Sequence, residues 1–220
     1  TEGGQTSRTN FVLDHNKNLG TGKSLHTMAF VSHYDFELYS NFTFFLEDPV
    51  NGDQIRQKEN RVLMGAKTVF QDESAQLGEL HFKYNAGIGF RYDNVDDMEL
   101  SHTRNRQELL ERLAYGDVDE VNTYGFAGAV FKTGKFTLEP AVRLDYFKFD
   151  YLNKLSTVYD NQSDEKVAFS PKFNTIYSPT ENTQIFLKTG IGFHSNDARV
   201  VVANNGKDIL PAAYGVDLGT

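Results

Sequence analysis

Seven ionisable side chains have types and positions that suit ligand binding. They are Arg91, Asp93, His102, Arg104, Arg106, Asp145 and His194. His102, Arg104 and Arg106 form a small basic cluster, which suits an anionic ligand because guanidinium groups pair strongly with anionic oxygens. An ordinary solvated surface is the alternative for this cluster. Pairing with neighbouring charges is the alternative for the other residues, because a buried unpaired charge is costly.

No motif in the chain supports catalysis, a cofactor or a metal site. Gly20–Ser24 reads GTGKS but lacks the first glycine of a phosphate-binding loop, so we predict a hairpin turn there. The six histidines are scattered and there are no cysteines, so no metal-ligand spacing is present. We therefore predict a protein that is not an enzyme, with no cofactor and no metal.

Composition narrows the class of protein further. A net charge of -8 disfavours nucleic acid as a partner. The sequence has no run of about 18 apolar residues, which argues against a transmembrane helix. Mean hydropathy is low, yet the chain holds 18 Phe and 11 Tyr. This combination suits strands that are apolar on one face only.

Alternation of apolar and polar side chains predicts a series of long strands. In Phe136–Tyr146, Val142 and Leu144 alternate with Arg143 and Asp145. About nine strands are expected: Ser7–Asp14, Leu25–Phe36, Arg61–Gln71, Glu79–Asp93, Asn122–Lys132, Phe136–Tyr151, Lys166–Ser178, Gln184–Phe193 and Ala213–Thr220. Several are long enough to cross a bilayer, which takes about 9–11 tilted residues.

The predicted connections alternate in length. Tight ones are expected at Asn16–Lys23, Asp72–Gln76, Thr133–Lys135 and Pro179–Asn182, and long ones at Glu37–Asn60, Asn94–Asp117, Leu152–Glu165 and His194–Pro211. This pattern is typical of an all-β antiparallel meander within a larger transmembrane β-barrel, with short periplasmic turns and long extracellular loops. A soluble β-sandwich binding module is the alternative fold. Within the second long connection, the leucines of Arg104–Gly116 share one face and predict a helix.

Aromatic residues gather where strands enter the long connections, which predicts an interfacial girdle. The set is Tyr34, Phe36, Tyr39, Phe90, Tyr92, Tyr146, Phe147, Phe149, Tyr151 and Phe193. On the opposite face, six charged side chains are expected to point inward: Lys83, Arg91, Glu139, Arg143, Asp145 and Lys172. The repeated sequences NAGIGF and KTGIGF add Gly87, Gly89, Gly190 and Gly192 to that face. These glycines either allow close approach of a plug or ligand, or mark a bulge or a repeated strand type.

Several segments resemble the barrel of TonB-dependent outer-membrane receptors. They are Ser40–Arg56 (SNFTFFLEDPVNGDQIR), Ser170–Pro179 (SPKFNTIYSP), the following ENTQIFLKTGIGFHSNDAR, and LPAAYGVDLGT. In that family a strand beginning S-P-K, a Tyr-Ser-Pro turn, a strand ending G-x-G-F and an Asp-Arg pair recur before a strand of the type Y-G-x-E-x-G. Asp217 replaces the usual glutamate. The resemblance covers most of the chain and is strongest from Phe136 to Thr220.

The resemblance implies a plugged barrel of about twenty-two strands. Such a receptor imports a scarce ligand, for example a ferric siderophore, across the outer membrane of a Gram-negative bacterium. The implied partners are outer-membrane lipid, a small chelated-metal ligand, and the TonB complex reached through a plug that this chain lacks. Polar Thr1–Gln5 and strand-like Ala213–Thr220 suggest that residues 1–220 are a single internal segment of the barrel. A non-transporting surface adhesin or ligand-binding barrel is the alternative function.

Overall fold

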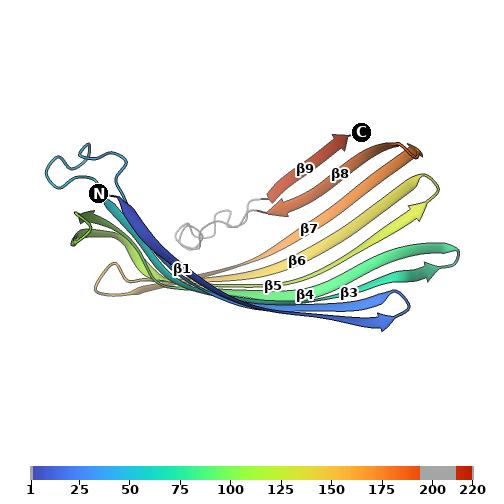
Figure 1. The fold of residues 1–220 in the computed structure, drawn as a ribbon, viewed down its shortest axis with the longest axis horizontal. Helices are drawn as coiled ribbons and strands as arrows, with labels where there is room; N and C mark the ends of the chain where they lie inside the picture. The colour runs from blue at the N-terminus through green and yellow to red at the C-terminus, as the bar shows by residue number, and fades with distance from the viewer. Residues whose placement is uncertain (1, 194–211, 220) are drawn as a thin grey trace.

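The computed structural model describes residues 2–193 and 212–219, whose strands form one antiparallel sheet. The strands pair in chain order, from β1 with β2 to β8 with β9. Their bounds are β1 Gly3–Gly20, β2 Lys23–Ser40, β3 Ile55–Leu77, β4 Leu80–Arg104, β5 Glu108–Thr133, β6 Phe136–Asn153, β7 Asp160–Thr180, β8 Thr183–Phe193 and β9 Ala212–Gly219. The sheet is curved, and β8 and β9 rise away from the first strands (Figure 1). The predicted all-β meander is confirmed.

The alternative of a soluble β-sandwich is wrong. All described strands belong to a single sheet, and none of them forms a second sheet against it. Bulky apolar side chains remain exposed on one face, among them Ile88 at 70% and Leu144 at 53%. A sandwich would bury that face against its partner sheet. No helix in the described part of the chain has the length and apolarity to span a membrane.

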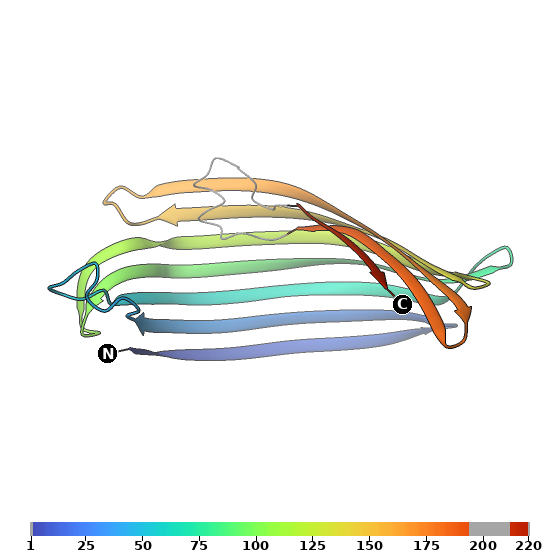
Figure 2. The ribbon, with the colours of Figure 1, turned by 90° about the horizontal axis from the view of Figure 1, so that it is seen from above.

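Tight turns join strand pairs at one end of the sheet, which we call the tight-turn end (Figure 2). The β1–β2 turn uses Thr21 and Gly22 with φ of 46° and 74°, which confirms a hairpin at Gly20–Ser24. The turns after β5 and β7 also lie where predicted. The predicted position of the turn after β3 is wrong: the chain continues as a strand to Leu77 through a bulge between Asp72 and Ala75. Polar residues within Asp72–Gln76 therefore mark an irregular strand rather than its end.

The opposite end, which we call the long-loop end, has connections shorter than predicted because the strands run further. The loops there are residues 41–54 and 154–159, and the β8–β9 connection lies outside the described residues. The predicted helix Arg104–Gly116 is wrong, because most of it belongs to β5. Asn105 and Arg106, with φ of 54° and 62°, form a tight turn closed by the Gln107 N–H donating to the Arg104 carbonyl at 3.1 Å. Two left-handed central residues are the signature of a type I′ hairpin. The ladder of this hairpin satisfies the backbone hydrogen bonds of both strands, whereas an isolated helix of this length would be only marginally stable.

The strand register separates two faces. Ile88 and Leu144 both align with Gly125 between them, so they lie on the same face, which we call the apolar face. We call the face with Arg91 and Arg143 the polar face. All six charged residues predicted to point inward lie on this face: Lys83, Arg91, Glu139, Arg143, Asp145 and Lys172.

Two aromatic belts bound the apolar face. Toward the long-loop end lie Phe90, Tyr92 and Tyr146, and the Tyr146 hydroxyl donates to Glu165 at 2.7 Å. Toward the tight-turn end the rings of Phe82 and Phe131 stack at 5.1 Å, as do those of Phe136 and Tyr177 at 4.8 Å. From the first belt to the second, β4 covers about 33 Å at 3.3 Å per residue, or about 23 Å at a tilt of 45°. This matches the apolar band of roughly 25 Å in outer-membrane barrels.

The girdle prediction is therefore right for Phe90, Tyr92 and Tyr146 but wrong for most of the others. Phe147, Phe149 and Tyr151 lie on the polar face, where they pack with Val95 and Val118 as a buried cluster. The Phe193 ring meets Phe147 edge-on at 5.3 Å. Tyr34 and Phe36 also lie on the polar face, and Tyr39 is buried. Closeness to a loop is a poor guide to the face on which an aromatic ring lies, because side chains keep alternating between the two faces in the extended strand ends.

Cross-strand rings explain the first pair of repeated glycines. A Cβ at Gly87 would lie 2.6 Å from the Phe126 ring, and one at Gly89 would lie 2.6 Å from the Tyr124 ring. A close approach therefore comes from β5 itself, and no bulge interrupts the register at these two glycines. Gly190, in the second repeat, meets nothing closer than 3.6 Å.

Gly89→Ala is therefore expected to lower the free energy of unfolding by about 1–3 kcal/mol, because the added methyl group overpacks the Tyr124 ring. Gly190→Ala is the matched control and should be neutral or slightly stabilising, because it restricts the unfolded chain without a clash. Urea unfolding of the refolded full-length barrel measures both. Equal effects would show that the ring does not constrain Gly89.

Candidate functional site: the polar face and its rim

Asp145 is the most deeply buried candidate residue. Its carboxylate is fully buried and accepts two hydrogen bonds from Arg143, both at 2.7 Å. The Asn122 side chain on β5 donates a third at 3.1 Å. The Arg143 guanidinium in turn lies 3.9 Å from the centre of the Tyr124 ring. Asp145 is thus paired on two sides and holds Arg143 in a fixed position on the polar face.

Arg91 and Asp93 repeat this arrangement on β4. Arg91 donates to Asp93 at 2.8 Å, and Arg61 on β3 lies 3.6 Å from the other carboxylate oxygen. Asp93 is buried, while the Arg91 side chain is 47% exposed. The expected pairing of these charges is confirmed. Arg91 faces Asn122 in the strand register, so the two Arg-Asp pairs form one band across β4, β5 and β6.

His102, Arg104 and Arg106 lie at the long-loop end instead. His102 Nε2 is 2.6 Å from the Gly52 carbonyl oxygen, and Arg104 donates to Asn51 at 3.4 Å. The Arg106 guanidinium lies 5.1 Å from the centre of the Tyr39 ring. These contacts dock the β4–β5 turn onto the loop of residues 41–54.

The candidates therefore form two groups rather than one. Arg91 and His102 are roughly 35 Å apart along β4 at about 3.3 Å per residue. The first group, Arg91, Asp93 and Asp145, lies on the wall of the sheet, and the second lies at its rim. His194 falls outside the described residues. Among the described residues, no cluster of histidine and acidic side chains could hold a metal ion.

A buried ionic network that the sequence did not reveal supports the rim. Glu99 accepts hydrogen bonds from Arg56, from the Ser101 hydroxyl at 2.7 Å and from Arg112 at 3.3 Å. Burial alone would raise the pKa of Glu99, but these bonds outweigh it and lower the pKa. Glu99 therefore stays ionised and ties β3, β4 and β5 together beyond the apolar band.

The loop of residues 41–54 is held together by hydrogen bonds to one carboxylate and exposes several apolar side chains. The Asp53 carboxylate accepts hydrogen bonds from the amides of Leu46, Glu47 and Asp48 at 2.7–3.2 Å. Exposed apolar side chains nonetheless cover it: Phe42 at 82%, Phe44 at 65%, Phe45 at 59%, Leu46 at 72% and Val50 at 78%. The sequence signal for this surface is the run NFTFFL, which lies within the predicted long connection Glu37–Asn60 and within the segment Ser40–Arg56 that carries part of the family resemblance.

Replacing Asp53 with asparagine is expected to loosen this loop. Partial burial acts to raise the pKa of Asp53, but the amide hydrogen bonds from Glu47 and Asp48 outweigh it and hold the pKa below its ordinary value. Because the folded pKa is lowered, the stabilisation is fully present above the ordinary carboxyl pKa and is lost as pH falls through the lowered one. The Asn variant lacks the negative charge at every pH. Its loop at neutral pH should therefore be as loose as the native loop becomes in strong acid.

A spin label on Val50→Cys can report this change, since residues 1–220 contain no native cysteine. Label mobility should rise in Asp53→Asn and stay unchanged in Glu47→Gln, which removes one negative charge but keeps both Asp53 carboxylate oxygens that accept from the loop amides. A rise in both variants would mean that net charge, not the hydrogen bonds, orders the loop.

A curved antiparallel meander with one apolar face and one charged face, and with tight turns at one end, has the architecture of the wall of a membrane-type β-barrel. The model of the TonB dependent receptor-like β-barrel family matches residues 1–213. The chain belongs to this family, which consists of transport receptors.

Two solved structures show the same fold. The ferric citrate transporter FecA, in its unliganded form, superposes with a TM-score of 0.81 at 12% identity, covering 97% of this chain and 32% of FecA. The ferric-catecholate import receptor Fiu from K12 E. coli gives a TM-score of 0.74 at 12% identity, covering 99% of this chain and 38% of Fiu. The chain thus spans about a third of these receptors. No curated protein matches it.

Proposed function

We propose that residues 1–220 are one segment of an outer-membrane receptor that imports a scarce ligand, such as a ferric siderophore, with energy relayed by the TonB complex. The plug and the remaining strands belong to the rest of the full-length protein in this proposal. The tight turns then face the periplasm, and the rim with residues 41–54 faces the outside of a Gram-negative cell.

The observation that carries the proposal is the continuity of charge along the polar face. Ionisable side chains run from His102 at the rim, through Arg91 and Arg143, to Lys172 and finally to Lys83 near the tight turns. The reverse side of the same strands is apolar between its aromatic belts. A wall built this way lets a polar solute pass along its inner surface while its outer surface meets lipid.

Within this proposal, Arg104 at the rim and Arg91 on the wall contact an anionic ligand. Both side chains are exposed. Asp93 and Asp145 then position their arginine neighbours instead of touching the ligand, because both carboxylates are buried in ion pairs. His102 and Arg106 hold the rim loop in place.

Growth of a strain with the full-length gene, under iron limitation and with or without TonB, tests the proposal. Growth should depend on both the receptor and TonB. Arg91→Gln and Arg104→Gln should each weaken ligand binding, whereas Lys148→Gln on the outer side should not. Receptor-dependent attachment or ligand binding that persists without TonB, with no growth benefit, would instead support the non-transporting adhesin or ligand-binding barrel.

A further inference from the structure

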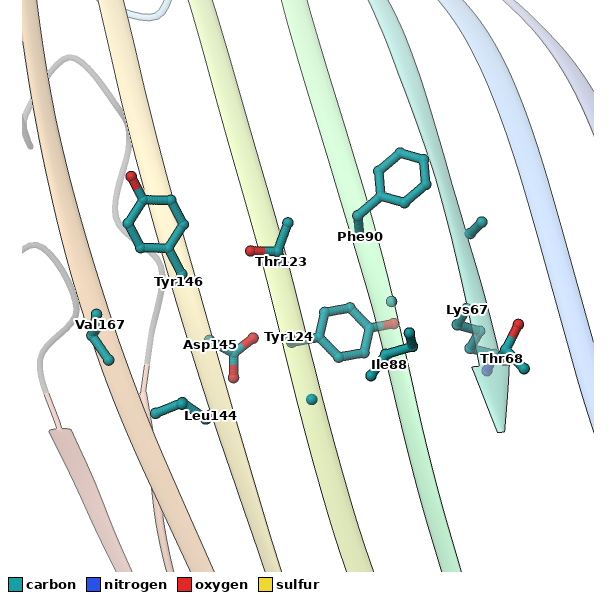
Figure 3. A pocket seen from close by; sticks show the side chains of 13 residues that line it. Lys67, Thr68, Ile88, Phe90, Thr123, Tyr124, Leu144, Asp145, Tyr146 and Val167 are labelled. Atoms are coloured by element: carbon teal, nitrogen blue, oxygen red, sulfur yellow. The ribbon is translucent and has the colours of Figure 1, made fainter. Parts of the chain in front are cut away.

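A hollow of about 630 Å³ opens on the apolar face, across β3 to β7. Figure 3 shows Ile88 and Phe90 from β4 on one side of Thr123, with Leu144, Tyr146 and Val167 on the other. Ala66, Thr68 and Gly125 complete its apolar-face lining. Its remaining lining residues, Lys67, Gly89, Tyr124 and Asp145, each lie between two of these in sequence. Alternation therefore turns their side chains to the polar face, and only their backbone borders the hollow.

The depth of the hollow comes from a difference in side-chain size between neighbouring strands. In one row across the sheet, Ile88 and Leu144 flank Gly125, and in the next row Phe90 and Tyr146 flank Thr123. A Cβ at Gly125 would make only ordinary van der Waals contacts, at 3.8 Å from the Gly87 carbonyl oxygen and 3.9 Å from Ile88 Cγ2, so the glycine forms the floor of the hollow without crowding. The walls are bulky and exposed, with Ile88 at 70% and Leu144 at 53%.

The position of the hollow indicates what fills it. It lies inside the apolar band, immediately on the tight-turn side of the belt residue Tyr146, whose hydroxyl is held by Glu165. A hollow in this band is continuous with the surface that faces hydrocarbon, where water has no polar partner to bind.

The charges beyond the belt do not favour recognition of an anionic head group. The one nearby cation, among the described residues of β5, β6 and β7 on this side, is Lys148, and it is already paired with Asp150 at 2.9 Å. Glu165 and Asp119 add further negative charge there. The hollow therefore suits the hydrocarbon chain of a lipid and not the lipid head group.

We propose that this hollow is a binding site for one acyl chain of an outer-leaflet membrane lipid, which lies along β5 between the ridges formed by β4 and β6. The chain buries its methylene groups against Ile88, Phe90 and Leu144 and rests on Gly125. The site goes beyond ligand import, because it is on the opposite face of the sheet from the charged wall. It retains a lipid at a defined position rather than as part of a freely exchanging layer.

Native mass spectrometry of the detergent-solubilised full-length receptor, with added dipalmitoyl phosphatidylethanolamine or dipalmitoyl phosphatidylglycerol, tests the site. The native receptor should retain one lipid of either head group. Gly125→Phe should weaken retention by about tenfold, the effect of displacing about two methylene groups from the wall. Val142→Phe, which adds the same ring to the β6 ridge at a position outside the lining of the hollow, should retain the lipid as the native protein does.

Heat-modifiable gel mobility checks that both variants are folded, and Gly125→Leu provides a smaller filling group if Gly125→Phe is not. Equal retention by folded Gly125→Phe or Gly125→Leu and by the native receptor would overturn the proposal. Retention that depends on the head group would also overturn it. A native dimer that Gly125→Phe converts to monomer would show that a second copy occupies the hollow instead. None of these outcomes depends on transport, so the site and the import proposal fail separately.

Discussion

Arg143→Met is expected to lower the free energy of unfolding of the barrel by about 3–5 kcal/mol, because it leaves a buried carboxylate without its cation. Asp145 is fully buried and takes two of its three hydrogen bonds from Arg143. Asn122 would then be its remaining side-chain donor. Urea unfolding of the refolded full-length receptor in lipid vesicles measures the loss.

Lys148→Met is the matched control for this prediction. Lys148 and Asp150 form an ion pair with the same two-residue spacing on the same strand, but their side chains are 48% and 32% exposed. An exposed pair contributes about 0–1 kcal/mol. Similar losses in the two variants would mean that the polar face around Asp145 is as well hydrated as the outer surface.

An arginine placed on the apolar face should be costly in proportion to its depth. Val142 lies between the aromatic belts, and Val142→Arg should therefore cost about 2–4 kcal/mol in a bilayer. Tyr146→Arg, in the belt and beside Glu165, should cost about 0–1 kcal/mol. The comparison uses unfolding in vesicles and again in a water-soluble amphiphile. A cost independent of depth would contradict the assignment of this face to lipid.

Much of the fold follows from the period of two in the side chains. That pattern locates the strands and their two faces. A shift of the strand register by one residue would move Val142 and Leu144 to the charged face, so few registers are compatible with the alternation. It also explains the failures. The sequence of the extended β4–β5 end wrongly predicts a loop with a helix, since polar residues such as Asp96 and Asp97 interrupt the alternation at a bulge.

The candidate site was predictable only within each strand. Arg91 and Asp93 share a face with the same spacing as Arg143 and Asp145, so each pair can be read from the sequence. Their cross-strand partners, Arg61 and Asn122, depend on register and bulges that no local pattern specifies. The contact between the Tyr124 ring and Gly89 could not be predicted from the sequence for the same reason.

The pairing of every strand with its neighbour in the chain has a consequence for how the wall is made. Each seam in the described sheet joins two strands that are consecutive in the chain, and tight turns such as Gly134–Lys135 bring their strands together at once. Closing short loops costs little chain entropy, and sheets dominated by local pairings form quickly. The wall can therefore assemble by zippering in sequence order, each finished strand serving as the template for the next. Only the final seam of a complete barrel has to join residues far apart in the chain.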